Sequence, residues 1–249
     1  MIPGALLETA PSTGQIWRIV ENQEEAATRR ITRSAEEQSR LEALLDLNKP
    51  AYLPGTEQLH WLLKTPFRYP PLRHGSRFGT AFAPGILYGS RELATAMTES
   101  AVYLWLFRAG PTELGPLTRI CDGRTAIEFS ISHDQVSDLT ADTVQRYRTR
   151  ISAPDDYSFS QELGARLRDN HTAAIWFHSA RTTSGINCAV LDPQAIPVGT
   201  RPTQQHWQLQ LDSSSCWWGL AGRESFEVRY DDVTDKTGRI PHPALQGRG

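Results

Sequence analysis

Apolar and polar residues alternate in several short stretches of the second half of the chain. Residues 206–212 (HWQLQLD) and 225–230 (SFEVRY) place every second side chain on an apolar face, as half-buried strands do. Residues 126–132 (AIEFSIS), 173–180 (AAIWFHSA) and 186–192 (INCAVLD) are short runs that favour β-structure. The pattern therefore predicts a second half that consists mostly of strands.

The first quarter of the chain follows a helical pattern. Residues 14–21 (GQIWRIVE) are a strand candidate, and a charged, alanine-rich segment follows them. We predict a helix over 24–47 because its leucines recur at near-helical spacing. This helix should end before Pro50, since the residue before a proline avoids the helical region. A second short helix is predicted over 57–63.

Two further helices are predicted in the middle of the chain. A short strand over 85–90 (GILYGS) leads directly into a helix over 91–110. The apolar residues that share one face of this helix are Leu93, Met97, Ala101 and Leu104. Residues 158–170 also have a helical pattern, with Ser158 and Gln161 at the spacing of a capping box.

These elements favour an α+β fold, in which strands are mixed with short helices. They lack the regular strand–helix alternation that is typical of a doubly wound sheet. A length of 249 residues suits a single domain with one large elaboration. The helical segment at about 24–63 is the candidate for that elaboration.

The composition is that of an ordinary globular protein, with 39% hydrophobic and 22% charged residues. The net charge of −2 does not indicate a general attraction to nucleic acids or anionic membranes. Three cysteines without a CxxC or histidine-spaced pattern argue against a disulfide framework and a zinc site. The beginning of the sequence has no positively charged segment with an apolar run behind it, so we expect a cytoplasmic protein and no export.

One stretch combines several cations without any acid to pair with them. Residues 67–79 (FRYPPLRHGSRFG) contain Arg68, Arg73 and Arg77 but no carboxylate. A solvated surface loop explains each arginine taken alone, since arginine is mostly exposed. Together they indicate a local site for an anionic ligand, because arginine binds phosphate through two parallel hydrogen bonds. Arg18, which follows a tryptophan on a predicted strand, is also a candidate for binding an anion. The alternative interpretation is an arginine at the edge of the strand whose aliphatic stem covers apolar surface.

Three polar residues are further candidates. Glu99 lies about 130° from the centre of the apolar stripe of its helix, so it is a boundary glutamate or a carboxylate that faces a cleft. Tyr88 ends a short strand, where its ring is a core aromatic or projects into a cleft. Ser179 caps the turn after its strand or lines a site; with His178 it forms no catalytic dyad, because neighbours in a strand point to opposite faces.

The usual short catalytic motifs are absent from the sequence, which has no GxGxxG, Walker A, HExxH or GxSxG pattern. Five landmarks nevertheless resemble, in their order, those of the RES-domain family, named for its arginine, glutamate and serine. The landmarks are WR at 17–18, RF at 77–78, LYGS at 87–90, Glu99 on the next helix and HSAR at 178–181. The resemblance covers roughly residues 14–192.

The resemblance implies a fold similar to that of ADP-ribosyltransferases, with a mixed β-sheet core. It implies one RES-type domain over 1–249, in which SFEVRY is the closing strand. The helical insertion at about 24–63 separates Arg18 from Arg77 by more than in compact members. A lid, an antitoxin-binding surface and a dimer contact are the alternatives for this insertion.

Residue roles also follow from the resemblance. It implies that Glu99 is the catalytic carboxylate and that Arg18 and Arg77 bind the diphosphate of NAD⁺, with Arg77 close to the chemistry. Tyr88 would lie against the nicotinamide or its ribose, and Ser179 would line the site. Arg68 and Phe78 are additional binding candidates, and no metal is required.

The function that the resemblance implies is that of a bacterial toxin of a toxin–antitoxin pair that cleaves the nicotinamide–ribose bond of NAD⁺. NAD⁺ is then a substrate and not a prosthetic group, and water or inorganic phosphate is the acceptor. ADP-ribosyl transfer to a protein and a non-catalytic nucleotide- or partner-binding module are the alternatives. The implied partner is an Xre-like helix-turn-helix antitoxin, which would contact DNA in place of this chain, and a homo-oligomer within that complex stays open.

Overall fold

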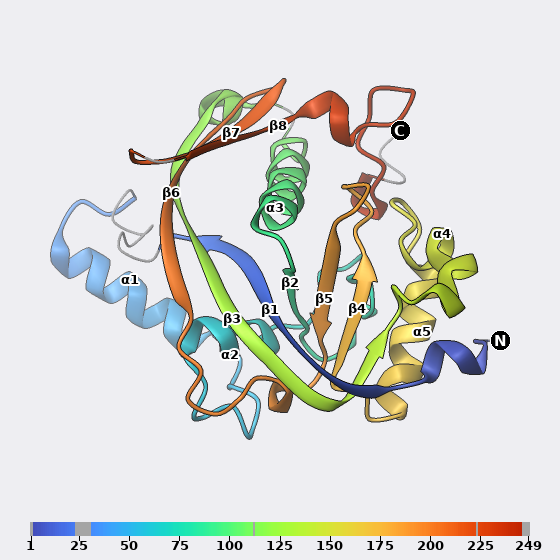
Figure 1. The fold of residues 1–249 in the computed structure, drawn as a ribbon. Coiled ribbons are helices and arrows are strands. Elements are labelled where there is room, and N and C mark those ends of the chain that lie inside the picture. The colour runs from blue at the N-terminus through green and yellow to red at the C-terminus, as the bar shows by residue number, and fades with distance from the viewer. Residues whose placement is uncertain (1, 23–30, 112, 223, 246–249) are drawn as a thin grey trace.

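The computed structural model describes residues 2–22, 31–111, 113–222 and 224–245. They form an eight-stranded mixed sheet that bends strongly, with helices packed against it (Figure 1). The α+β class is therefore confirmed. The strands are β1 (Ala10–Glu21), β2 (Leu87–Ser90), β3 (Ile120–Asp138), β4 (Ala174–His178), β5 (Ile186–Val190), β6 (Thr203–Leu211), β7 (Ser215–Leu220) and β8 (Glu224–Arg229). The α-helices are α1 (Ala35–Leu47), α2 (Trp61–Arg68), α3 (Leu93–Arg108), α4 (Arg148–Ile151) and α5 (Ser158–Asp169).

Strand order divides the sheet into a closed part and an extension. The order is β1-β2-β5-β4-β3-β6-β7-β8, and β1 also pairs with β3. The first five strands therefore close on themselves, while β6, β7 and β8 extend the sheet from β3. β3 and β4 run parallel, whereas the other pairs of the described strands are antiparallel.

The central strands β4 and β5 are apolar on both faces because each face packs against a different layer. On β4, Trp176 belongs to a buried cluster with Leu63 and Phe67 of α2. Its neighbour Phe177 belongs to a second cluster, together with Leu163 of α5. A strand that is covered on both sides carries a continuous apolar run instead of an alternating one, which explains the AAIWFHSA pattern.

Helix α3 packs against the sheet extension. Its buried residues Met97 and Ala101 contribute to a cluster with Trp207 and Trp218 of β6 and β7. Of the predicted apolar stripe, Leu93 and Leu104 are only partly buried, and the buried face turns instead toward Val102 and Trp105. Because the extension lies on that side, tertiary packing shifts the face that the spacing predicted.

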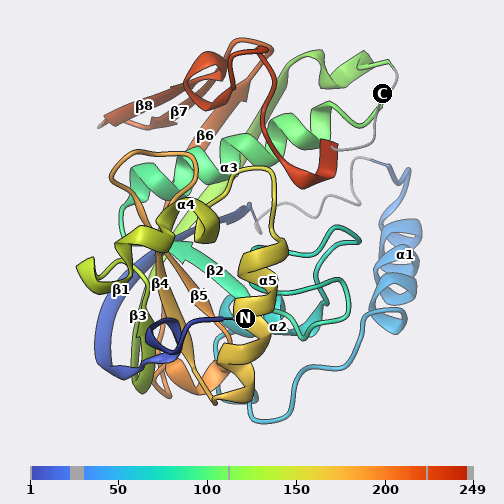
Figure 2. The same ribbon diagram turned by 90° about the vertical axis from the view of Figure 1, so that its right-hand side faces the viewer.

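The two predicted helices of the 24–63 segment have different bounds in the structure. α1 begins at Ala35, because the Ser34 side chain accepts a hydrogen bond from the Glu37 backbone N–H and caps the helix. The prediction that it begins at 24 is wrong for residues 31–34, and residues 23–30 lie outside the described part. No residue of α1 is buried, and the helix lies at the periphery in both views (Figures 1 and 2).

α2 spans Trp61–Arg68 and not 57–63. Its first turn is capped by His60, whose Nδ1 accepts a hydrogen bond from the Leu62 N–H. The helix continues through Pro66, which has no N–H to donate to the Leu62 carbonyl.

Two other details differ from the prediction. Ser158 and Gln161 do not form a capping box: Tyr157 is the residue before α5, and the Gln161 side chain donates to the carbonyls of His74 and Ser76. SFEVRY does not close the sheet, because β8 pairs with β7 alone among the described strands and lies at the edge of the extension. Among the described helices, none is long and apolar enough to cross a membrane.

Candidate active site

A cavity of about 400 Å³ lies where β1, β2, α3 and β5 meet. Four of the residues predicted for the site contribute to its walls, namely Arg18, Arg77, Tyr88 and Glu99. They come from β1, the loop before β2, β2 itself and α3. The fold therefore brings together side chains that are scattered over more than eighty positions of the sequence.

Glu99 is held by two neutral hydrogen-bond donors. Its Oε1 accepts one bond from the Ser179 hydroxyl and another from the Asn187 side-chain amide, each of 2.7 Å. The Ser90 hydroxyl in turn donates to Oδ1 of Asn187 at 2.6 Å, which orients the amide. Ser90 and Asn187 are register partners in the β2–β5 pair, so strand pairing builds this contact.

The second carboxylate oxygen of Glu99 has no hydrogen-bond partner among the described residues. Glu99 is only partly buried and lines the cavity. The arrangement fixes one oxygen and leaves the other available to a ligand.

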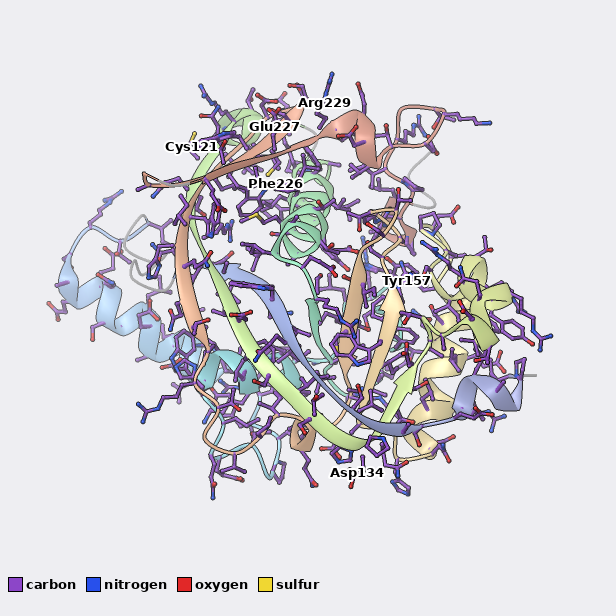
Figure 3. All side chains as sticks on the ribbon, viewed as in Figure 1. Cys121, Asp134, Tyr157, Phe226, Glu227 and Arg229 are labelled. Carbon is purple, nitrogen blue, oxygen red and sulfur yellow. The ribbon has the colours of Figure 1, made fainter. Side chains whose placement is uncertain are left out.

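Arg77 is almost fully buried, with 9% of its surface exposed. Its Nη1 donates to the carbonyls of Ile151 and Ala153, at 3.0 and 2.9 Å, and its guanidinium lies 4.5 Å from the ring centroid of Tyr157. Tyr157, which is labelled in Figure 3, also lines the cavity. Nε and Nη2 of Arg77 have no hydrogen-bond partner in the described part of the chain, so they can bind an anion.

Tyr88 connects the two arginines. Its backbone carbonyl accepts a 2.7 Å hydrogen bond from Arg18 Nη1. Its hydroxyl donates to Ser76 Oγ and accepts from the Phe78 N–H, both at 3.0 Å, so it holds the residues on either side of Arg77. Burial raises the pKa of Tyr88 to about 12, and the phenol stays protonated. The ring lines the cavity while the hydroxyl is used within the protein.

Arg18 is a partly desolvated cation. Burial lowers its pKa from the ordinary value, and Nε is buried without a hydrogen-bond partner among the described residues. No ion pair of the described residues includes Arg18. A buried cation of this kind is stabilised when an anion binds beside it.

The loop that carries Arg77 depends on one glycine. Gly75 has φ of +76°, a conformation that costs other residues free energy. A Cβ at this position would also lie 2.6 Å from the Gly79 carbonyl. The glycine therefore allows the tight bridge between Ser76 and Gly79 that turns the arginine inward.

The remaining predicted residues lie elsewhere. Ser179 is outside the cavity wall but bonds Glu99, and it also accepts from the Arg181 and Thr182 N–H groups as a turn cap. The Phe78 side chain is buried against Phe177, with ring centroids 4.9 Å apart, and does not line the cavity. Arg68 donates to the Pro50 carbonyl and covers the Tyr52 ring, away from the cavity.

Several residues of the site were missed in the sequence. Asn187, Tyr103 and Tyr157 line the cavity together with the predicted set. A signal existed for Asn187, because a polar amide inside the apolar run INCAV requires a buried partner. The two tyrosines stand in segments whose sequence pattern has no such signal.

A buried histidine from the end of the described chain packs beside the cavity. His242 is 3% exposed, and the rings of His74, Tyr103 and Tyr157 surround it with centroids 5.3 to 5.7 Å away. Burial, followed by the charges of Arg181, His74 and Arg77, lowers its pKa to about 3. Within the described residues, no cluster of histidine, cysteine and carboxylate side chains could hold a metal ion.

Fold and cavity together define an α+β protein with a polar site of one carboxylate and two arginines. The family model of the RES domain matches residues 50–212, which is more than half of the chain, and the chain belongs to this family. The match does not include β1, on which Arg18 lies, or β7 and β8.

The solved structures that resemble this chain include one of a toxin–antitoxin complex. A chain in the crystal structure of the M. tuberculosis MbcT–MbcA toxin–antitoxin complex is similar, with 14% sequence identity and a TM-score of 0.48. The similarity covers 84% of this chain and 93% of that chain. No curated protein matches the sequence.

Proposed function

We propose that this protein cleaves the bond between nicotinamide and ribose in NAD⁺. The observation that carries the proposal is the meeting of Glu99 with Arg18 and Arg77 in one cavity. NAD⁺ contains a diphosphate, which arginines bind, and a cationic leaving group on a ribose carbon. Membership of the RES-domain family supports the same substrate class.

The two arginines would bind the diphosphate. Each uses Nη1 for a backbone carbonyl of the protein, which fixes its orientation. Their remaining N–H groups are the donors for phosphate oxygens. The bound substrate is thereby positioned without a large loss of side-chain freedom, since the arginines are already held in place.

Glu99 would stabilise the transition state. As the C1′–N1 bond breaks, its electron pair leaves with nicotinamide and positive charge develops on the ribose ring. The free carboxylate oxygen can accept a hydrogen bond from a ribose hydroxyl and stabilise this charge. With water as acceptor the products are nicotinamide, ADP-ribose and a proton; with phosphate they are nicotinamide and ADP-ribose 1″-phosphate.

The decisive experiment is incubation of the purified protein with NAD⁺, with and without inorganic phosphate, followed by identification of the products. Release of nicotinamide by the wild type, and its loss in Glu99→Gln, is the expected result. Glu227→Gln is the matched control, because Glu227, which is labelled in Figure 3, is an exposed glutamate on β8 and does not line the cavity. The proposal would be wrong if labelled ADP-ribose appeared attached to a protein and neither free ADP-ribose nor its phosphate was formed. That result would show ADP-ribosyl transfer.

We also propose that the protein is the toxin of a toxin–antitoxin pair, with an Xre-like helix-turn-helix protein as its antitoxin. The ordered landmarks and the family match support this role. Expression of the chain alone should deplete cellular NAD⁺ and stop growth, and Glu99→Gln should relieve both effects. Growth arrest at constant NAD⁺ would contradict the proposal.

A further inference from the structure

A second cavity, of about 340 Å³, adjoins the first. Its described wall residues come from β1, α2, α3 and β3. Arg18, Ile19 and Ser100 line both cavities, so the two spaces meet along β1 and α3. Each volume lies within the range of about 300–1,000 Å³ that is usual for small-molecule sites.

Arg18 stands at the junction. Its guanidinium is anchored on the Tyr88 carbonyl, on the side of the first cavity, and its Nε is buried without a partner among the described residues. An anion bound to Arg18 is therefore adjacent to both spaces. A ligand with an anionic centre and a group at each end can occupy both cavities at once.

The second cavity has the lining of a site for a flat, uncharged group. Trp61 opens α2 and is 44% exposed, which leaves indole surface free to stack, and Leu62 and Pro66 add apolar contacts. The one other cation in its described wall, Arg124, is already paired with Glu21 and Asp122, at 3.5 and 3.2 Å. The charge of Arg124 is thus compensated by two carboxylates of the protein, whereas Arg18 has no ion pair among the described residues.

We propose that the second cavity takes the adenosine half of NAD⁺, with the adenine ring against Trp61 and the diphosphate at Arg18. The inference rests on the proposed function for the choice of NAD⁺. It assigns the part of the predicted 24–63 insertion that begins α2 to substrate binding. The nicotinamide half is then left beside Glu99, where the bond breaks.

The test compares ligands that contain adenosine with ligands that lack it. Calorimetry measures the binding of ADP and of inorganic pyrophosphate to wild type, Trp61→Ala, Trp61→Phe and the control Trp217→Ala. Trp217 is similarly exposed, at 40%, but lies on β7 outside both cavities. Loss of a base–aromatic stack should weaken ADP binding about tenfold in Trp61→Ala. Pyrophosphate binding should fall much less, and Trp61→Phe should retain most of the affinity for ADP.

Kinetics provide an independent readout. The ratio of kcat/KM for NAD⁺ to that for nicotinamide mononucleotide, which lacks adenosine, should fall about tenfold in Trp61→Ala and stay constant in Trp217→Ala. The proposal would be overturned if Trp61→Ala weakened ligands with and without adenosine equally. It would also be overturned if Trp61→Ala bound ADP as tightly as the wild type. If the wild type cleaves neither nucleotide, the proposed cleavage fails, and the ADP comparison still decides whether the adenosine site exists.

Discussion

The hydroxyl of Ser179 donates a 2.7 Å hydrogen bond to Oε1 of Glu99 and so joins the turn after β4 to the middle of α3. The same oxygen of Ser179 accepts two backbone N–H groups of its own turn. The two roles considered for Ser179, a turn cap and a site residue, are therefore combined in one side chain. The turn positions the serine, and the serine positions the carboxylate.

Substitution of Asn187 should separate orientation from charge. Asn187→Ala removes one of the two bonds to Oε1 and leaves Ser90 without its acceptor, so we expect kcat to fall roughly 10- to 100-fold with a small change in KM. Asn187→Asp should be worse, because it places a second negative charge beside Glu99. The rate of nicotinamide release is measured for both variants. A wild-type rate in Asn187→Ala would contradict an orienting role for the amide.

The arginines of the FRYPPLRHGSRFG stretch should differ sharply. Arg77→Lys loses the planar guanidinium, whose Nη1 donates to two carbonyls and whose Nε and Nη2 have no partner among the described residues, so the KM for NAD⁺ should rise about tenfold or more. Arg68→Lys should stay within about twofold of the wild type, because Arg68 lies outside the cavity. Steady-state kinetics measure both, and a similar rise for Arg68→Lys would contradict the assignment.

Removal of the Tyr88 hydroxyl should loosen the Arg77 loop. Tyr88→Phe loses the contacts with Ser76 and the Phe78 N–H, and the free energy of unfolding should fall by about 1–2 kcal/mol. The folded pKa of about 12 is raised above the usual value near 10, so this group stabilises the fold below pH 10 and loses its contribution as the pH rises toward 12. Denaturant unfolding measures the free energy of unfolding at pH 9 and at pH 11.5. Its decrease between these two pH values should be smaller for Tyr88→Phe than for wild type.

His242 should make the protein sensitive to acid. Its folded pKa of about 3 is lowered from 6.5, so its neutral form stabilises the fold above pH 6.5 and this contribution is lost as the pH falls toward 3. Glutamine at position 242 cannot titrate in this range. Between pH 7 and pH 4 the free energy of unfolding of His242→Gln should therefore fall by about 1–3 kcal/mol less than that of the wild type. His74, whose pKa is also lowered by burial, remains in both proteins. Parallel pH profiles in urea unfolding would contradict this role of His242.

The local elements could be predicted because their periodicity is written in neighbouring residues. The strands over 14–21, 173–180 and 206–212 and the helix over 91–110 all correspond to elements of the structure. Their ends could not be predicted as well. α1 begins where Ser34 caps it, and α2 extends past Pro66, because caps and packing decide where a helix stops and starts.

Only some of the residues that line the cavity could be predicted from the sequence. Arg18, Arg77, Tyr88 and Glu99 all line it, whereas Arg68 does not, although its local sequence is as basic as that of Arg77. The difference arises from the fold: the Gly75 turn directs Arg77 inward, whereas α2 places Arg68 over Tyr52. Gly75 is visible in the sequence beside Arg77, but the direction of its turn and the packing of α2 are set by the tertiary structure.

The sequence by itself determined the helical and strand segments, the uncompensated cations and the order of the family landmarks. Only the tertiary structure decided that Glu99 is held by Ser179 and Asn187, which lie 80 and 88 positions away. The contact with Asn187 depends on the register of β2 with β5, and the second cavity depends on the packing of α2 beside β1. Periodicity is a local property of the chain, whereas strand register and the meeting of distant side chains are set by the packing of the whole core.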